Sequence, residues 1–183
     1  MRAGCFLKPS LVRDSAIISL ILGVNLFGQN AETQSNNLIT PTSVAGITIG
    51  ANVGEARKFL RGTSFLRVEG EGIEIVDVQL NQKTLMYFYL EPTGEGAPAD
   101  ESTNIETIEV VDSRYRTSEG IHCGLKVSEV GKIYGKMLEF IVNDYDESEN
   151  MPFSDRPENY QFTVEKSGGG YIIIKISVSD PAF

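Results

Sequence analysis

Two stretches of the chain repeat their apolar residues at the spacing of a short amphipathic helix. In each stretch these residues fall at positions i, i+3, i+6 and i+7, which lie on one side of a helix. The apolar residues are Val53, Ala56, Phe59 and Leu60 in the first stretch and Val127, Val130, Ile133 and Tyr134 in the second. Each stretch closes on a glycine, Gly62 or Gly135, which readily takes the left-handed conformation that ends a helix. The pattern predicts two short helices.

The two predicted helices begin differently. Asn52 precedes the first helix and Glu55 lies three residues further on, a spacing typical of a capping pair. Lys126 stands at the corresponding place before the second helix, so that helix start is less well specified. Glu55 and Glu129 fall in the first turns, where the helix dipole favours an acidic side chain.

Several segments with strand-like apolar patterns follow each predicted helix. They cover residues 65–68, 73–80, 85–90 and 105–111 after the first helix, and 138–142, 160–165 and 171–178 after the second. The Ser-Gly-Gly-Gly run at residues 167–170 predicts a tight hairpin, because glycine supplies the positive φ values that such a turn needs. Two longer acidic loops, residues 91–104 and 143–159, are candidates for recognition, since loops on a rigid sheet often carry it.

One residue pattern occurs twice, 74 positions apart. The identical pairs are Gly46 and Gly120, Ile47 and Ile121, Gly50 and Gly124, Val53 and Val127, Glu55 and Glu129, and Lys58 and Lys132. Such internal similarity indicates a duplicated unit. We therefore expect an α+β fold of two tandem repeats, residues 31–112 and 113–183, forming one compact domain. Each repeat is a short helix packed on an antiparallel sheet, and the strands of both can join into one curved sheet.

The first 30 residues have the pattern of a signal peptide. Arg2, Lys8 and Arg13 precede an apolar run at residues 16–27, which is too short for a membrane span of about 20 residues but fits the apolar region of a secretory signal. We expect residues 1–30 to be a signal peptide and the protein to be periplasmic or secreted in a bacterium. A short membrane-associated N-terminus is the alternative.

The charge of the chain narrows the classes of partner. The formal net charge is −9, and residues 31–183 carry 13 basic against 24 acidic side chains. This acidic balance argues against nucleic acid, which proteins bind largely through Lys and Arg. It also disfavours anionic membrane surfaces, and we expect no stable membrane span after residue 30. Cys123 would be the only cysteine left, so no internal disulfide is expected.

The second copy of the repeated pattern resembles a known motif. Residues 124–135, Gly-Leu-Lys-Val-Ser-Glu-Val-Gly-Lys-Ile-Tyr-Gly, look like the motif of small bacterial envelope proteins of the SmpA/OmlA type. Tandem helix-plus-sheet units also resemble the fold of secreted β-lactamase-inhibitor proteins, and residues 113–121 are similar to a pattern of uncharacterised exported bacterial proteins. The resemblance implies an exported, noncatalytic binding or assembly role, with no particular ligand.

His122 and Cys123 are adjacent, but neighbours on a strand point to opposite faces and cannot converge on one atom. We expect a surface position at His122 and a buried free thiol at Cys123. His122 is the single histidine of the chain, which disfavours a zinc site and a Ser-His-Asp or Cys-His triad. Enzymatic activity is therefore not expected, although paired carboxylates leave a hydrolase as an alternative.

One loop imitates the oxygen spacing of a calcium site. Its candidate ligands are Asp144, Asp146, Ser148, Asn150 and Asp155. Glu149 stands where such loops need a glycine for their turn, and a solvated acidic loop is the other interpretation. Calcium is the one cofactor that the sequence suggests, and only weakly by this spacing.

A compact basic and aromatic cluster stands out in the acidic chain. It consists of Arg114, Tyr115 and Arg116, with His122 nearby, and Arg and Tyr are enriched where proteins bind one another. The alternative is a strand end whose charges pair with local acids. Residues 87–89, Tyr-Phe-Tyr, are better explained by core and cross-strand packing.

Together these patterns predict a noncatalytic exported protein that binds a macromolecular partner, a protein in the cell envelope or outside it. The binding surface would be the concave side of the sheet or the two acidic loops. A periplasmic calcium- or small-ligand-binding protein is the alternative, followed by a carboxylate-dependent hydrolase.

Overall fold

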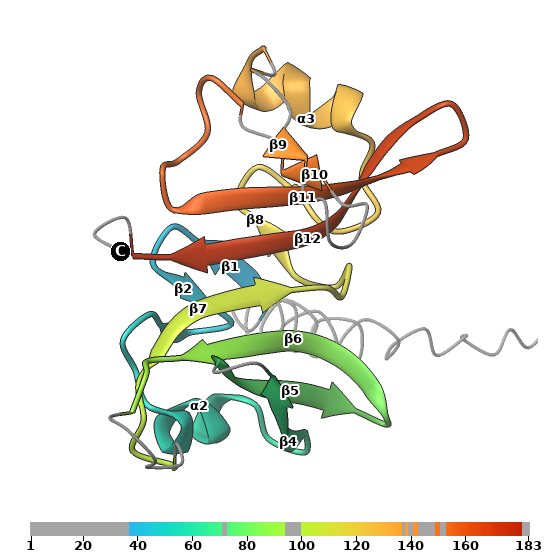
Figure 1. The fold of residues 1–183 in the computed structure, drawn as a ribbon. Helices are drawn as coiled ribbons and strands as arrows, with labels where there is room; N and C mark the ends of the chain where they lie inside the picture. Colours follow the sequence, from blue (N-terminus) through green and yellow to red (C-terminus); the bar gives the residue numbers. More distant parts are fainter. Residues whose placement is uncertain are drawn as a thin grey trace, which may run out of the picture. The chain divides into compact units, whose positions relative to one another are not determined.

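Two mostly antiparallel sheets and two helices make up the part of the chain that the structure, a computed structural model, describes (Figure 1). The described residues are 37–70, 73–93, 100–136, 138, 141–142, 149–150 and 153–180, all within one unit, Gln34–Phe183. The prediction of an α+β fold is confirmed. The predicted signal peptide lies outside the described residues.

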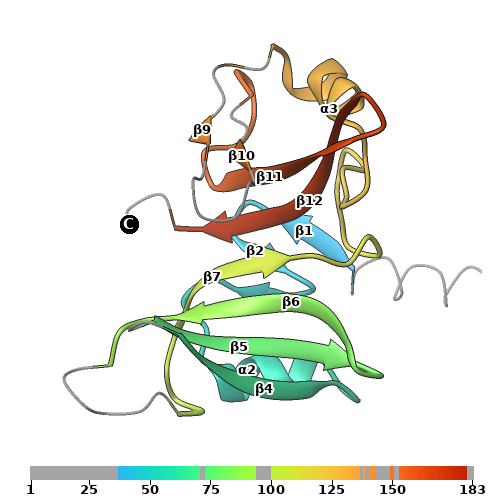
Figure 2. The same cartoon turned by 45° about the vertical axis from the view of Figure 1, so that its right-hand side comes forward.

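The larger sheet contains eight strands, and every neighbouring pair is antiparallel. The strands are β4 (Ser64–Gly70), β5 (Ile73–Leu80), β6 (Lys83–Leu90), β7 (Ile105–Val110), β9 (Ile141–Val142), β10 (Glu149–Asn150), β11 (Tyr160–Ser167) and β12 (Gly170–Ser179). Their order in the sheet is β4-β5-β6-β7-β12-β11-β10-β9 (Figure 2). Since β7 pairs with β12, strands that follow the first helix and strands that follow the second share one sheet.

The smaller sheet was not predicted. It contains β1 (Leu38–Thr40), β2 (Ser43–Val44), β3 (Ile47–Thr48) and β8 (Arg116–Thr117) in the order β3-β2-β1-β8. These strands have two or three residues each, too few for an alternating pattern to be recognised. The pairing of β1 with β8 is parallel, unlike the others.

Both helices form where the apolar spacing predicts them, α2 at Val53–Phe59 and α3 at Val127–Tyr134. The side chain of Asn52 caps α2 by accepting a 2.9 Å hydrogen bond from the backbone N–H of Glu55. Lys126 supplies no side-chain acceptor at α3, where instead Glu129 Oε2 accepts from the backbone N–H of Lys126 at 3.4 Å. The side chain of Asn52 at α2 and that of Glu129 at α3 thus each accept a backbone hydrogen bond at the helix start.

The strand predictions agree with the structure except near residue 140. The hairpin at residues 167–170 is confirmed, because Ser167 pairs with Gly170 and the two glycines between them have φ values of 55° and 85°. Of the strand predicted at residues 138–142, Ile141 and Val142 form β9 and Leu138 is not in a strand, while residues 139 and 140 lie outside the described residues.

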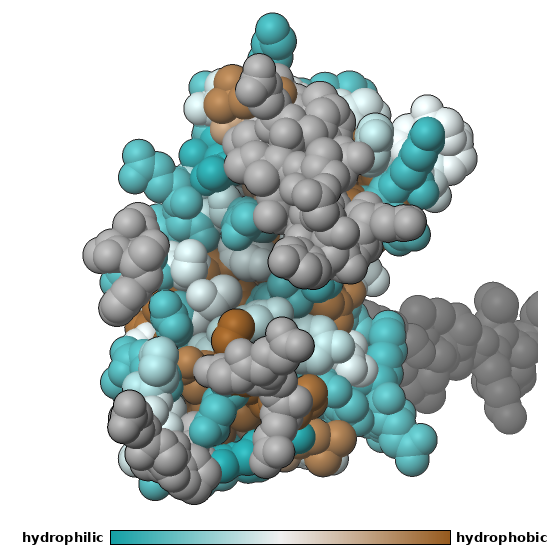
Figure 3. Space-filling model, viewed as in Figure 1, coloured by the Kyte–Doolittle hydropathy of each residue, from teal (hydrophilic) through white to brown (hydrophobic). Residues whose placement is uncertain are grey.

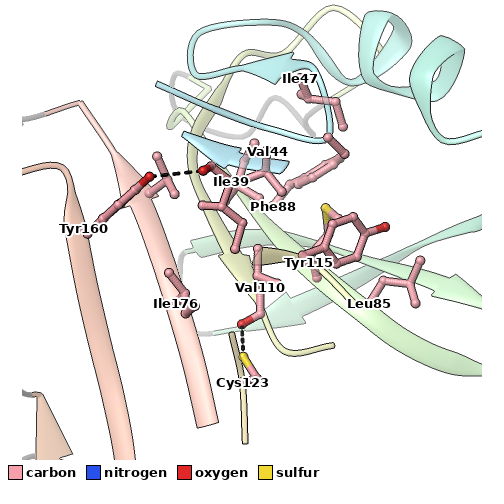
Figure 4. Close-up of a cluster of buried hydrophobic side chains, with 14 of the residues drawn as sticks. Ile39, Val44, Ile47, Leu85, Phe88, Val110, Tyr115, Cys123, Tyr160 and Ile176 are labelled. Atoms are coloured by element: carbon pink, nitrogen blue, oxygen red, sulfur yellow. Dashed lines mark hydrogen bonds between the residues drawn. The ribbon is translucent and has the colours of Figure 1, made fainter. Parts of the chain in front are cut away.

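The core lies on one face of the larger sheet, where buried side chains of the smaller sheet and of both helices pack against it. Figure 4 shows the part of this core that lies between the two sheets. Phe88 of β6 lies 6.0 Å from the ring of Phe65 of β4, and Phe162 of β11 lies 6.1 Å from Tyr134 of α3. Cross-strand partners share a face, so the register assigns the remaining side chains of each strand to the opposite face. That opposite face is called the open face below.

Candidate functional site

Two rows of side chains cross the open face of the larger sheet. The first row, in strand order from β4 to β11, is Leu66, Asp77, Tyr87, Glu109, Ser177 and Gln161. The second row, from β4 to β12, is Val68, Ile75, Tyr89, Thr107 and Ser179. Both rows change from aliphatic at β4 through tyrosine at β6 to small and polar at β12. We call these residues the open-face rows.

Two carboxylates, Asp77 and Glu109, flank Tyr87 in the first row, and each is only 8% exposed. Asp77 Oδ2 accepts hydrogen bonds from Gln79 Nε2 at 2.5 Å and from Thr84 Oγ1 at 3.2 Å. Asp77 Oδ1 is buried and has no hydrogen-bond partner among the residues that the structure describes. Within this part of the chain, the carboxylate is held through Oδ2.

Glu109 is held by groups from the two neighbouring strands. Its Oε1 accepts a hydrogen bond from the Tyr89 hydroxyl at 3.4 Å and lies 3.3 Å from Lys175 Nζ. Burial and the negative charge of Glu109 raise the pKa of Tyr89 to about 12. Tyr89 is therefore neutral at physiological pH and acts as a hydrogen-bond donor. Side chains of the sheet itself therefore bond both acids.

The β4 end of the open face is apolar and exposed. Leu66 is 48% exposed, Val68 is 44% exposed, and Ile73 at the start of β5 is 55% exposed. In Figure 3 apolar and polar residues adjoin one another over the lower half of the view, where β4, β5 and β6 lie. The two tyrosines beside this exposed aliphatic group are of the residue type enriched at protein interfaces.

The predicted cluster of Arg114, Tyr115, Arg116 and His122 does not form one surface. Tyr115 is only 3% exposed, and Figure 4 shows its ring in the core. The prediction that Tyr115 belongs to a contact surface is wrong. Side chains alternate between the two sides of the chain where it enters β8, so Tyr115 points into the core while Arg114 and Arg116 are exposed. Arg114 Nε pairs with Asp112 Oδ1 at 3.0 Å, which agrees with the alternative of local charge pairing.

Asp112, beside that cluster, forms ion pairs with Lys83 and Arg114. It is 3% exposed and lies 2.8 Å from Lys83 Nζ, and it also accepts from the backbone N–H of Arg114 at 2.9 Å. Burial alone would raise the pKa of Asp112, but the hydrogen bonds from Lys83 and Arg114 outweigh it, so the pKa is below its ordinary value. The carboxylate therefore stabilises the junction between β6 and the chain after β7.

Cys123 is buried as expected, although neither it nor His122 lies on a strand. Cys123 is a buried free thiol whose Sγ donates a hydrogen bond to the carbonyl of Val110 at 3.3 Å. Burial and the nearby acids raise its pKa to about 12. His122 is partly exposed, and its Nδ1 lies 2.8 Å from the carbonyl of Cys123. The thiol is therefore a core side chain.

The calcium hypothesis falls mostly on residues that the structure does not describe. Asp144, Asp146 and Ser148 lie outside the described residues, and Asn150 is on β10, where its Cα partner is Thr163. Asp155 lies beside the end of α3, where its backbone N–H donates to the carbonyl of Tyr134 at 3.0 Å. Within the described ranges, no group of three or more His, Cys, Asp or Glu side chains could hold a metal ion.

The open-face rows were not identified as a site from the sequence. The signal was present only in part, because Ile73, Ile75, Asp77 and Gln79 share one parity along β5. Tyr87 and Tyr89 share a parity along β6 in the same way. Only the strand register shows that these two sets lie on the same face and meet Glu109.

Comparison with known proteins supports the fold and says nothing of the function. No known family model matches the chain, and no curated protein matches it. The crystal structure of the uncharacterized protein yfeY from Escherichia coli is similar, with a TM-score of 0.57 and 14% sequence identity over 78% of this chain and 99% of that chain. Within the described residues, no helix is both long and apolar enough to cross a membrane.

Proposed function

We propose that this protein is an exported, noncatalytic binding protein that recognises a macromolecular partner through the open-face rows. One observation carries the proposal. Both helices and the smaller sheet pack on one face of the larger sheet, while the other face presents tyrosines, fixed acids and exposed aliphatic side chains. A signal-like N-terminal sequence supports the export part of the proposal.

The chemistry of the open face favours a protein as the partner. Tyr87 and Tyr89 offer a large, rigid contact area. Leu66 and Val68 add solvent-exposed apolar area that a partner could bury. The carboxylate of Asp77 is already desolvated, so a partner has little water to remove from it. With the acidic balance of the chain, a partner surface that combines basic and apolar side chains fits best.

We also propose that the domain arose by duplication of one α+β unit. The strand order supports this. The four strands of each half follow one another in sequence order from the outer edge of the sheet to its centre, where the last strand of the first half, β7, pairs with the last strand of the second half, β12. Equivalent turns support it too. Gly50 donates a 2.8 Å hydrogen bond to the carbonyl of Ile105, and Gly124, at the equivalent position, donates a 2.7 Å bond to Ile173. Gly50 and Gly124 have φ values of 85° and 91°.

The test compares capture of envelope and secreted proteins by the tagged wild type and by two variants. The double variant Leu66→Asp/Tyr89→Ser changes the open face, whereas Ile133→Asp changes an exposed apolar residue of α3. We expect one protein to be retained by the wild type and by Ile133→Asp and lost by the double variant, then to bind as a purified protein in calorimetry. If the double variant, with unchanged circular dichroism, retains every captured protein, the proposal is wrong.

A further inference from the structure

The buried carboxylate of Asp77 has a hydrogen-bonding capacity that the described residues do not use. Gln79 and Thr84 donate to its Oδ2, whereas Oδ1 is buried and has no hydrogen-bond partner among those residues. A buried carboxylate oxygen without a donor has lost its hydration with no compensation. Native structures satisfy the great majority of such atoms, so this one needs an explanation. A donor brought by a binding partner provides one.

The strand register places an aromatic ring beside this carboxylate. Tyr87 of β6 is the cross-strand partner of Asp77 on β5, and Figure 2 shows the two strands side by side. Side chains that lie directly opposite each other in an antiparallel pair have Cβ atoms about 5 Å apart. An aromatic ring attracts a cation to its face, and a carboxylate attracts it by charge. Asp77 and Tyr87 together therefore suit a cationic group.

The second acid of the same row, Glu109, already has a cation. Lys175 Nζ lies 3.3 Å from Glu109 Oε1, and the hydroxyl of Tyr89 donates to the same oxygen. Lys175 therefore neutralises Glu109 and repels a further cation from it. Among the described residues, no ion pair includes Asp77. A cation of the partner is thus directed to Asp77.

The neighbour of Asp77 on its other side is aliphatic. Leu66 of β4 is the cross-strand partner of Asp77 and is 48% exposed. A long basic side chain can lay its apolar stem on such a surface while its charged end meets the carboxylate. Arginine fits better than lysine, because guanidinium is planar, stacks on aromatic rings and offers several N–H donors to a carboxylate.

We propose that Asp77 and Tyr87 form a subsite for an arginine side chain of the partner protein, with the guanidinium hydrogen-bonded to Asp77 and stacked on the Tyr87 ring. The stem of the arginine covers Leu66. Since Oδ1 is buried, a neighbouring side chain changes its rotamer on binding, as is common at interfaces. The inference rests on the proposed function, because it names the side chain that the partner brings to the open face.

Two peptides that differ in charge test the subsite in the full chain. One is the acetylated and amidated tripeptide leucine-arginine-leucine, and the other carries citrulline in place of arginine, which keeps the shape and removes the charge. NMR titration of the isotope-labelled protein shows which strands respond. We expect the arginine peptide to shift backbone amide signals of β5 and β6 and to bind about tenfold more tightly, since charged hydrogen bonds are stronger than neutral ones.

Two variants test which side chains receive the arginine. Asp77→Asn should lose the preference for arginine over citrulline, whereas Glu158→Gln, which changes an exposed acid outside the sheet, should keep it. Tyr87→Leu removes the ring and should weaken binding of the arginine peptide several-fold. The amide spectrum of each free variant shows whether it is folded, and the peptide comparison on the wild type needs no variant.

Equal affinity for the two peptides, no response of β5 and β6 to either, or an arginine preference that survives in folded Asp77→Asn would each overturn the subsite. The capture experiment is a separate measurement. A captured partner together with equal peptide affinities would refute the arginine subsite and leave the proposed function standing. Failure to capture any partner, with the arginine peptide bound as expected, would count against the proposed function alone.

Discussion

The hydroxyl of Tyr160 on β11 donates a 3.2 Å hydrogen bond to the backbone carbonyl of Ile39 on β1, across 121 positions of sequence (Figure 4). Both residues are buried, at 2% and 1% exposure. The bond joins the larger sheet to the smaller sheet inside the core. Burial raises the pKa of Tyr160, so the hydroxyl keeps its proton for this bond.

We predict that Tyr160→Phe lowers the free energy of unfolding by about 1–2 kcal/mol, because a buried carbonyl loses its donor. Urea unfolding followed by circular dichroism measures this. Tyr115→Phe is the control, since the Tyr115 ring is also buried but its hydroxyl makes no hydrogen bond within the described residues. Equal stability of Tyr160→Phe and the wild type would show that the hydrogen bond contributes nothing.

We predict that Asp112→Asn lowers the free energy of unfolding by about 1–3 kcal/mol at neutral pH, because Lys83 and Arg114 lose their charged acceptor. The pKa of Asp112 is lower in the folded state than in the unfolded chain. Its contribution is therefore complete above the unfolded pKa of about 3.9 and is lost as the pH falls through the folded pKa.

The difference between wild type and Asp112→Asn should accordingly shrink as the pH falls below about 4 in a series of urea titrations. Glu158→Gln changes an exposed acid and is the control. A difference that stays constant down to the lowest pH at which the protein folds would contradict the assigned role of the charge.

We predict that Gly135→Ala destabilises the protein more than Gly124→Ala. Both glycines have positive φ, 74° and 91°, so alanine is strained at either position by about 1–2 kcal/mol. A Cβ at Gly135 would also collide with Asp155 Oδ2 and Ser154 Oγ, whereas a Cβ at Gly124 meets nothing within 4 Å. Thermal unfolding compares the two variants, and adding Asp155→Ala to Gly135→Ala should recover part of the loss. Equal melting temperatures would show that the collision is relieved without cost.

We predict that the Cys123 thiol does not react with Ellman's reagent at pH 8 while the protein is folded. Its pKa of about 12 leaves almost no thiolate, and the side chain is buried. The experiment uses a Cys5→Ser variant, with the same protein in guanidinium chloride as the fully reactive control. If the folded protein reacted within the mixing time, the thiol would be exposed to solvent and the prediction would be wrong.

Much of this fold could be predicted from local sequence alone. The spacing of Val53 and Ala56 predicts α2, the oxygen of Asn52 predicts its cap, and residues 167–170 predict the last hairpin. These features depend on residues close together in the chain, and their periods and turn chemistry are visible without knowing what lies nearby.

What only the tertiary structure decided depends on residues far apart. The pairing of β7 with β12 sets Glu109 beside Ser177, and the pairing of β1 with β8 accompanies the burial of Tyr115. Strand partners and their register are chosen by the packing of the whole core, so short strands and the face of an aromatic side chain carry little local signal. The sequence therefore determines the helices, most strands and the acidic charge, whereas the open-face rows exist only once the sheet has formed.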